Sequence, residues 1–223
     1  LIFFLIASFI GLYCLMRSFS ILVKGSAELR KWNRSRKTSR ADVCARKGLL
    51  LFAEGNYGSS EKYLLKGATD HPYPGLLYLF AAKATDAQKD SEKREFLLRK
   101  ALESDSQFSV AVAIVAAESA NGRGDWKGCL DHLTNIADNE TVLTLKKDAL
   151  LGGEDWRSLY ALLPSLRDSK LIDRDFEKRV ILSYFRDEKI PDSDRKMLKG
   201  KLSSTFREDP EIVLQYVKSL SDE

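Results

Sequence analysis

The sequence predicts an all-α fold built from repeated helical hairpins. Two amphipathic stretches flank a turn at Gly55, Asn56 and Tyr57, within the segment ARKGLLLFAEGNYGSSEKYLLKGATDHPYP that starts at Ala45. Gly48 is a small residue that lets two paired helices approach, and Pro72 stops the second helix before the next one begins. Period-two alternation of β-branched residues, which would indicate strands, is nearly absent.

The hairpin recurs at a fixed spacing. Counted from Tyr57, the equivalent positions are Ser91, Trp126 and Trp156, which gives steps of 34, 35 and 30 residues. The first two steps match the period of tetratricopeptide repeats, which stack helical hairpins into a solenoid. We therefore expect tetratricopeptide-like repeats over residues 41–170, divided as 41–74, 75–108, 109–141 and 142–170.

The N-terminus predicts a transmembrane helix over residues 1–23. Leu1 to Met16 carries no charge, and a helix that continues to Val23 spans about 34 Å, enough for the hydrocarbon core of a bilayer. The charges follow the apolar run, whereas in a signal peptide they precede it. Because the chain begins without Met and ends one helix into what looks like a further hairpin, we expect it to be a fragment.

A basic juxtamembrane linker is predicted over residues 24–40. Arg17 to Gly48 contains ten Lys or Arg against two acids, a local charge of +8 in a chain whose net charge is +4. Cations directly after an apolar helix predict that the repeats lie on the cytoplasmic face of the membrane. The residues expected at the membrane interface are Arg17, Lys24, Arg30, Lys31, Trp32 and Arg34.

This basic run has three interpretations. Contact with anionic lipid requires only the basic residues themselves, and it agrees with the predicted orientation in the membrane. Nucleic-acid binding is disfavoured because only Trp32 interleaves the charges and no nucleic-acid module follows. A solvated linker is the third.

Helices are expected in order after the first hairpin. They cover residues 76–87, 91–102, 110–120, 126–136, 141–151 and 156–166, and Pro164 should bend or end the last of these. The repeat phase is lost after Lys170, so residues 171–223 are an irregular helical segment leading into a further, truncated repeat. This segment should contain helices over 173–185, 193–206 and 212–220, the last one started by Asp209, Pro210 and Glu211.

The search for chemistry returns no catalytic, cofactor-binding or metal-binding residues. His71 lies in a predicted turn and His132 on a helix face, and neither has neighbours in sequence that suggest a converging site. Cys14, Cys44 and Cys129 share no metal-ligand spacing. Trp126 and Trp156 are interpreted as packing anchors at the start of second helices. No enzymatic activity is therefore expected.

A partner-binding surface is expected on the first helix of each pair, which lines the concave side of such a solenoid. Outward positions there are predicted to be mostly apolar, which suits a partner helix or a hydrophobic peptide. The expected contact residues are Leu49, Phe52, Leu76, Leu79 and Lys83.

The order of parts resembles the HemY proteins of proteobacteria. The matching segments, beside the apolar helix with its basic tail, are ARKGLLLFAEGNYGSSEKYLLKGA (Ala45 to Ala68), YLFAAKATDAQKDSEKREFLLRKA (Tyr78 to Ala101), GGEDWRSLYALLPSLRDSKLI (Gly152 to Ile172) and REDPEIVLQYVKSL (Arg207 to Leu220). The resemblance implies a protein on the cytoplasmic face of the bacterial inner membrane that acts in late haem synthesis. The family name is shared with an unrelated flavin-dependent protoporphyrinogen oxidase, but this sequence lacks the GxGxxG dinucleotide fingerprint.

Three functions follow as hypotheses. The first is a membrane-anchored, non-catalytic scaffold that docks haem-pathway enzymes on its repeats. The second is a carrier that binds porphyrin or haem directly, and the third is an envelope-assembly adaptor. Membrane lipid is an expected contact in each case, and nucleic acid is not.

Overall fold

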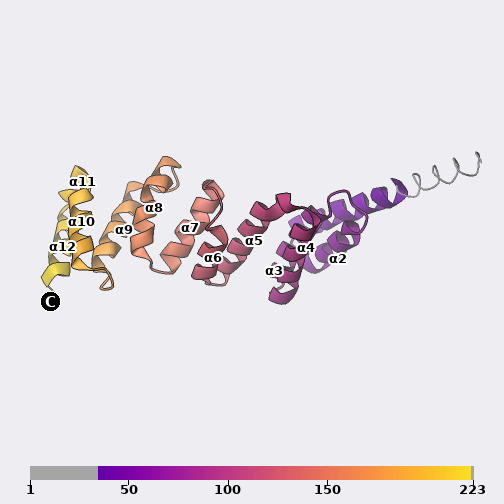
Figure 1. The fold of residues 1–223 in the computed structure, drawn as a ribbon, viewed down its shortest axis with the longest axis horizontal. Coiled ribbons are helices and arrows are strands. Elements are labelled where there is room, and N and C mark those ends of the chain that lie inside the picture. Colours follow the sequence, from indigo (N-terminus) through magenta and orange to yellow (C-terminus); the bar gives the residue numbers. More distant parts are fainter. Residues whose placement is uncertain (1–34, 222–223) are drawn as a thin grey trace, which may run out of the picture. The chain divides into compact units, whose positions relative to one another are not determined.

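The computed structural model describes residues 35–221, and every regular element in this range is helical (Figure 1). The predicted transmembrane helix over residues 1–23 lies outside the described residues. So do all six residues expected at the membrane interface: Arg17, Lys24, Arg30, Lys31, Trp32 and Arg34. None of the helices within residues 35–221 combines the length and apolar character that crossing a membrane requires.

Contacts divide the chain into two units that meet at Phe108 and Ser109. The first unit contains helical residues 35–53, called here the first described helix, and then α2 (Tyr57–Ala68), α3 (Pro74–Ala87), α4 (Ser91–Ser104) and the 3₁₀ turn η1 (Ser106–Phe108). The second contains α5 (Ser109–Gly122), α6 (Trp126–Leu133), α7 (Glu140–Gly152), α8 (Trp156–Asp168), α9 (Arg174–Arg186), α10 (Asp192–Lys201), α11 (Ser204–Arg207) and α12 (Pro210–Ser221).

Small residues allow the first described helix and α2 to pack closely. A Cβ on Gly48 would come within 2.7 Å of the Leu64 side chain, and the Ser60 hydroxyl donates a hydrogen bond to the Gly48 carbonyl. A Cβ on Gly67 would lie 3.1 Å from the Ala41 carbonyl oxygen. The close approach predicted at Gly48 is therefore present.

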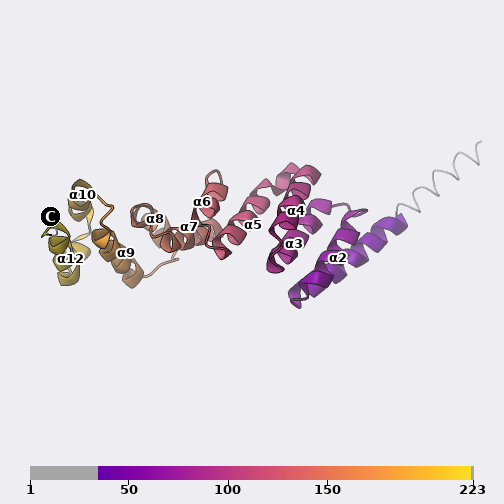
Figure 2. The same cartoon turned by 90° about the horizontal axis from the view of Figure 1, so that it is seen from below.

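α3 packs against α2 on one side and α4 on the other, and α3 and α4 lie side by side in both views (Figure 1, Figure 2). Its buried residues lie on several sides of the helix: Gly75, Leu77, Leu79, Ala81, Ala82, Ala84 and Thr85. Pro74 is at the first turn of α3, where the missing N–H costs no helical hydrogen bond.

All four repeat markers begin a helix, as the spacing predicted. Tyr57, Ser91, Trp126 and Trp156 are the first residues of α2, α4, α6 and α8. The residue before each marker caps the helix, because its side-chain oxygen accepts the backbone N–H three residues later; these caps are Asn56, Asp90, Asp125 and Asp155. The residue before each cap has positive φ, namely Gly55, Lys89, Gly124 and Glu154.

Three apolar clusters hold the second unit together. One joins α5, α6 and α7, the next joins α7, α8 and α9, and the last joins α9 to α10, α11 and α12. Trp126 packs onto the first cluster, and a Cβ on Gly152 would come within 2.7 Å of its ring. The packing role expected of Trp126 is thus observed.

Three expectations about this unit are corrected or refined. α8 continues past Pro164 to Asp168, with Leu163 and Leu166 buried on either side of it. Pro164 therefore does not end the helix. The helix expected over 193–206 is two helices, and the predicted repeat boundary at 141/142 falls within the first turn of α7.

The break between α10 and α11 has a visible cause. Leu202 has extended backbone angles and a buried side chain, and Phe206 is buried four residues later. The Arg207 guanidinium donates hydrogen bonds to the carbonyls of Gly200 and Leu202, which satisfies acceptors exposed by the break. The start of the last helix at Pro210 was predicted correctly.

Candidate functional site

The residues predicted to contact a partner are brought together in part. Leu49 and Phe52 are half-buried on the first described helix, Leu76 is 37% exposed on α3, and Lys83 is half-buried on α3. Leu79 is only 8% exposed, so the expected outward orientation of its side chain is wrong. The reason is that α2 and α4 pack against α3 from two sides, which leaves few positions open.

Phe80 takes the place that was expected for Leu79. Its ring centroid lies 5.7 Å from that of Phe52 in an edge-to-face contact, and Phe52 makes a similar contact with Tyr57 at 5.6 Å. Leu76, Phe80 and Lys83 are spaced four and three residues apart, so they share one side of α3. The sequence could have indicated Phe80, because Phe80 lies four residues after Leu76 and therefore on the same side of the helix.

We call the set Leu49, Phe52, Leu76 and Phe80 the Phe52 surface. It combines aromatic edges and aliphatic side chains from two helices, and each residue remains at least partly exposed. Partly exposed aromatic and aliphatic side chains on paired helices are the chemistry that binds the apolar face of a partner helix.

Two buried charged groups lock the helices next to this surface. The Glu61 carboxylate on α2 forms an ion pair with Lys93 on α4 and accepts a hydrogen bond of 3.0 Å from Gln88. Charges buried with partners are costly to disrupt, because removing one partner leaves the other uncompensated. This arrangement holds α2 and α4 on either side of α3.

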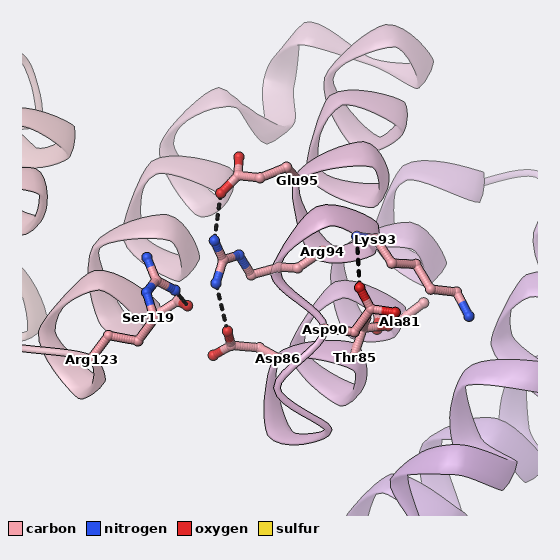
Figure 3. A network of polar contacts seen from close by, with 9 residues as sticks. All are labelled: Ala81, Thr85, Asp86, Asp90, Lys93, Arg94, Glu95, Ser119 and Arg123. Atoms are coloured by element: carbon pink, nitrogen blue, oxygen red, sulfur yellow. Dashed lines mark hydrogen bonds and ion pairs between the residues drawn. The ribbon is translucent and has the colours of Figure 1, made fainter. Parts of the chain in front are cut away.

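The second group is Arg94 on α4, which lies between Asp86 and Glu95 (Figure 3). Its guanidinium donates to Asp86 at 2.8 Å and to Glu95 at 2.6 Å. Burial acts to lower the pKa of Arg94, but the hydrogen bonds to the two carboxylates outweigh it and raise the pKa. The side chain therefore stays charged and acts as a fixed link between the end of α3 and the start of α4.

The two histidines belong to different units. Nδ1 of His71 accepts the Tyr73 backbone N–H at 3.1 Å, and the two rings make an edge contact, so His71 shapes the turn before α3. His132 is exposed on α6. Within residues 35–221, no group of three or more His, Cys, Asp or Glu side chains is arranged to hold a metal ion.

Cys129 is a fully buried thiol in the α5–α7 cluster. Burial raises its pKa, and the nearby carboxylates of Asp125 and Asp148 raise it further. The thiolate is the reactive form of cysteine, so the surroundings of Cys129 make it unreactive.

Two hollows of the second unit are lined by mixed charges. One of about 540 Å³ lies beside Tyr160, Arg174 and Lys201, and it also includes the ion pair of Arg167 with Glu177. Burial raises the pKa of the Tyr160 hydroxyl. Another of about 580 Å³ lies beside Arg195, whose guanidinium donates to the carbonyls of Asp187 and Ser219.

Comparison with known proteins finds similarity to HemY proteins. The family model described as HemY protein N-terminus matches residues 1–89. Protein HemY of Escherichia coli K12 and Protein HemY of Shigella flexneri are each 27% identical to this chain over 158 residues, which cover 69% of the chain and 40% of the relative. No solved structure matches the chain significantly.

The matched segment thus spans less than half of these curated relatives. The family-model match includes Ala45 to Ala68, the first of the segments that carried the resemblance. The N-terminal part of the chain is therefore similar to the N-terminal part of HemY proteins.

Proposed function

We propose that this protein is a membrane-anchored, non-catalytic scaffold of late haem synthesis that docks partner proteins on tetratricopeptide-like repeats. Similarity to HemY proteins supports the link to haem synthesis. The uncharged stretch from Leu1 to Met16 and the basic residues after it support anchoring in the bacterial inner membrane, with the repeats on the cytoplasmic face.

The observation that carries the docking role is the Phe52 surface. Phe52 and Phe80 meet edge to face across two helices, and Leu76 is exposed beside them. In complexes that place a helix in an apolar site, such side chains anchor the i, i+3, i+4 and i+7 positions of the partner. Lys83 lies one helical turn beyond Phe80 on the same side of α3, where a cation would favour a partner with an acidic residue at that end.

The hairpins supply a rigid support for this surface. The ion pair of Glu61 with Lys93 and the bonds of Arg94 fix α2, α3 and α4 together, so a partner would meet a preorganised site. Preorganisation raises affinity because fewer side chains are ordered on binding. Enzymes whose substrates are apolar and reside near the membrane are the partners that such a scaffold suits.

The test is affinity capture of the full chain from solubilised membranes, followed by mass spectrometry. The variants are Leu76→Glu alone and Leu76→Glu together with Phe52→Glu. A charge at an apolar anchor should weaken partner binding at least about tenfold. The matched control is Phe96→Glu, because Phe96 is an exposed aromatic on α4, outside the Phe52 surface.

Capture of haem-synthesis enzymes that is lost in the Leu76→Glu variants and kept in Phe96→Glu is the expected result. Equal capture by all variants, with unchanged helicity by circular dichroism, would show that the partners do not bind at the Phe52 surface. Co-purified porphyrin absorbance without a protein partner would instead favour the carrier hypothesis, and envelope-assembly proteins would favour the adaptor.

A further inference from the structure

The first described helix carries a line of exposed residues that the hairpin core does not use. Its members are Arg36, Arg40, Val43, Lys47 and Leu50, and all five are exposed. Their spacing of four, three, four and three residues places them along one side of the helix over about 21 Å. We call this line the basic-apolar stripe.

The opposite side of the same helix packs against α2 within the hairpin. Ala41, Ala45 and Gly48 are buried, and they face α2 through the close contacts of Gly48 with Leu64 and of Gly67 with Ala41. The stripe therefore faces away from the hairpin core. It also lies apart from Phe52, which turns toward Phe80 on α3.

The stripe is both apolar and basic. Val43 is 55% exposed and Leu50 is 60% exposed, which is high for aliphatic side chains in a folded protein. Beside Val43 lies a small hollow of about 280 Å³, lined mainly by apolar atoms of Ser39, Arg40, Val43, Cys44 and Lys66. Arg40 and Lys66 are basic residues from two helices, and both contribute to the lining of this hollow.

Lys47 adds a third cation on a fixed support. Its ammonium nitrogen lies 4.4 Å above the centroid of the Tyr63 ring on α2. Asp42, the acid adjacent to the stripe, is in an ion pair of 2.8 Å with Arg46. The face around Val43 therefore carries an excess of positive charge.

We propose that the basic-apolar stripe lies on the surface of an anionic phospholipid bilayer. Basic side chains are attracted to anionic headgroups, and aliphatic side chains between them enter the boundary between headgroups and acyl chains. A shallow hollow with an apolar lining and two cations suits a phospholipid, which has an acyl part and a phosphate. This inference rests on the membrane attachment proposed above, and it is independent of partner docking.

The sequence beside the stripe favours lipid over other anionic partners. The +8 segment from Arg17 to Gly48 continues from the apolar N-terminus directly into the stripe, so both belong to the stretch nearest the predicted membrane helix. Nucleic acid would be bound through cations and stacked aromatics, whereas the residues between the cations of the stripe are aliphatic. In this arrangement the first hairpin would rest against the membrane.

The test measures how fast an amine-reactive reagent labels individual lysines of the full chain in nanodiscs, read by mass spectrometry. One set of discs contains phosphatidylcholine alone, and the other contains phosphatidylcholine with phosphatidylglycerol. Lys47 and Lys66 report on the stripe and its hollow, and the exposed Lys127 and Lys196 of the second unit serve as internal references.

Anionic discs should slow labelling of Lys47 and Lys66 relative to the references, and high salt should restore it. In Arg40→Glu, protection should fall about fivefold or more, since each basic residue near an anionic surface contributes about that factor. Lys196→Glu is the matched control with the same change in charge, and it should keep the protection.

Three results would overturn the inference. A chain that enters neither kind of disc would contradict membrane attachment and the stripe contact together. A chain that enters both, with equal labelling of Lys47 and Lys66, would remove only the stripe contact. Protection of these lysines by added duplex DNA, without protection by phosphatidylglycerol, would assign the surface to nucleic acid.

Discussion

One cation and two carboxylates add a polar link between α9 and the start of α12. The Lys178 ammonium lies 2.9 Å from Asp209 and 3.0 Å from Glu211. The hydrogen bond from Lys178, together with the backbone N–H groups of Ile212 and Glu211, lowers the pKa of Asp209. Asp209 also precedes Pro210, so the same carboxylate pairs with Lys178 and caps the start of α12.

This carboxylate should make the attachment of α12 sensitive to acid. A carboxyl with a lowered pKa in the folded state stabilises the fold above its ordinary pKa of about 4, and the stabilisation is lost as pH falls through the folded value. In Asp209→Asn the cap is retained but the charge is gone. The hydrogen-exchange protection factors of α12 should therefore fall less between neutral and acidic pH than in the unsubstituted chain. Equal acid sensitivity in both proteins would show that other carboxylates dominate.

At the residue scale, the sequence predicted packing better than exposure. The close approach at Gly48 and the packing of Trp126 could be predicted because small and large residues recur in phase. The burial of Leu79 could not, since the number of neighbours around α3 depends on where α2 and α4 lie, and helical periodicity does not give this.

At the scale of elements, four hairpin corners share one construction. Each has a residue with positive φ, then a capping Asn or Asp, then the first residue of the second helix. Gly55 and Gly124 adopt positive φ easily, whereas Lys89 and Glu154 do so against the steric cost of a Cβ. The corner before α8 is therefore built like the corner before α6, but with a less suitable residue.

Substitutions at Gly124 and Glu154 should affect stability differently. Gly124→Ala should destabilise the second unit by about 1 kcal/mol, because alanine is strained at positive φ. Glu154→Gly should leave stability unchanged or raise it by up to about 1 kcal/mol, because relief of strain opposes the added freedom of the unfolded chain. Chemical denaturation followed by circular dichroism measures both, and a loss of stability in both variants would contradict this account.

Element positions were therefore predictable wherever turn chemistry marks them. The markers and caps have strong local signals, and so does Pro210. The continuation of α8 through Pro164 depends on burial of Leu163 and Leu166, and the break at Leu202 depends on burial of Leu202 and Phe206. Both are tertiary effects that override local preference.

At the scale of the whole molecule, the described helices pack mainly against neighbours in sequence. α3 contacts α2 and α4, and α9 contacts α8 and the C-terminal α12. The buried clusters of the second unit are formed from its own residues. Such a chain is held by local interfaces, so damage to one of them should remain local.

A cavity at Ile181 tests this locality. Ile181 is fully buried in the cluster of α9 to α12, and truncation of such a residue typically costs about 2 to 5 kcal/mol. In Ile181→Ala, hydrogen exchange should accelerate in α9, α10 and α12 and stay unchanged in α2. Leu64→Ala, in the first hairpin, should show the reverse pattern. Uniform acceleration along the chain in either variant would indicate a single cooperative unit.

The buried thiol of Cys129 offers a way to measure how often the α5–α7 cluster opens. Its side chain lies inside the α5–α7 cluster, whereas Cys44 is only half-buried on the first described helix. A thiol reagent should therefore modify Cys44 at once and Cys129 only during openings of the cluster. At high reagent concentration, the rate of Cys129 modification becomes independent of the reagent and equals the frequency at which these helices separate.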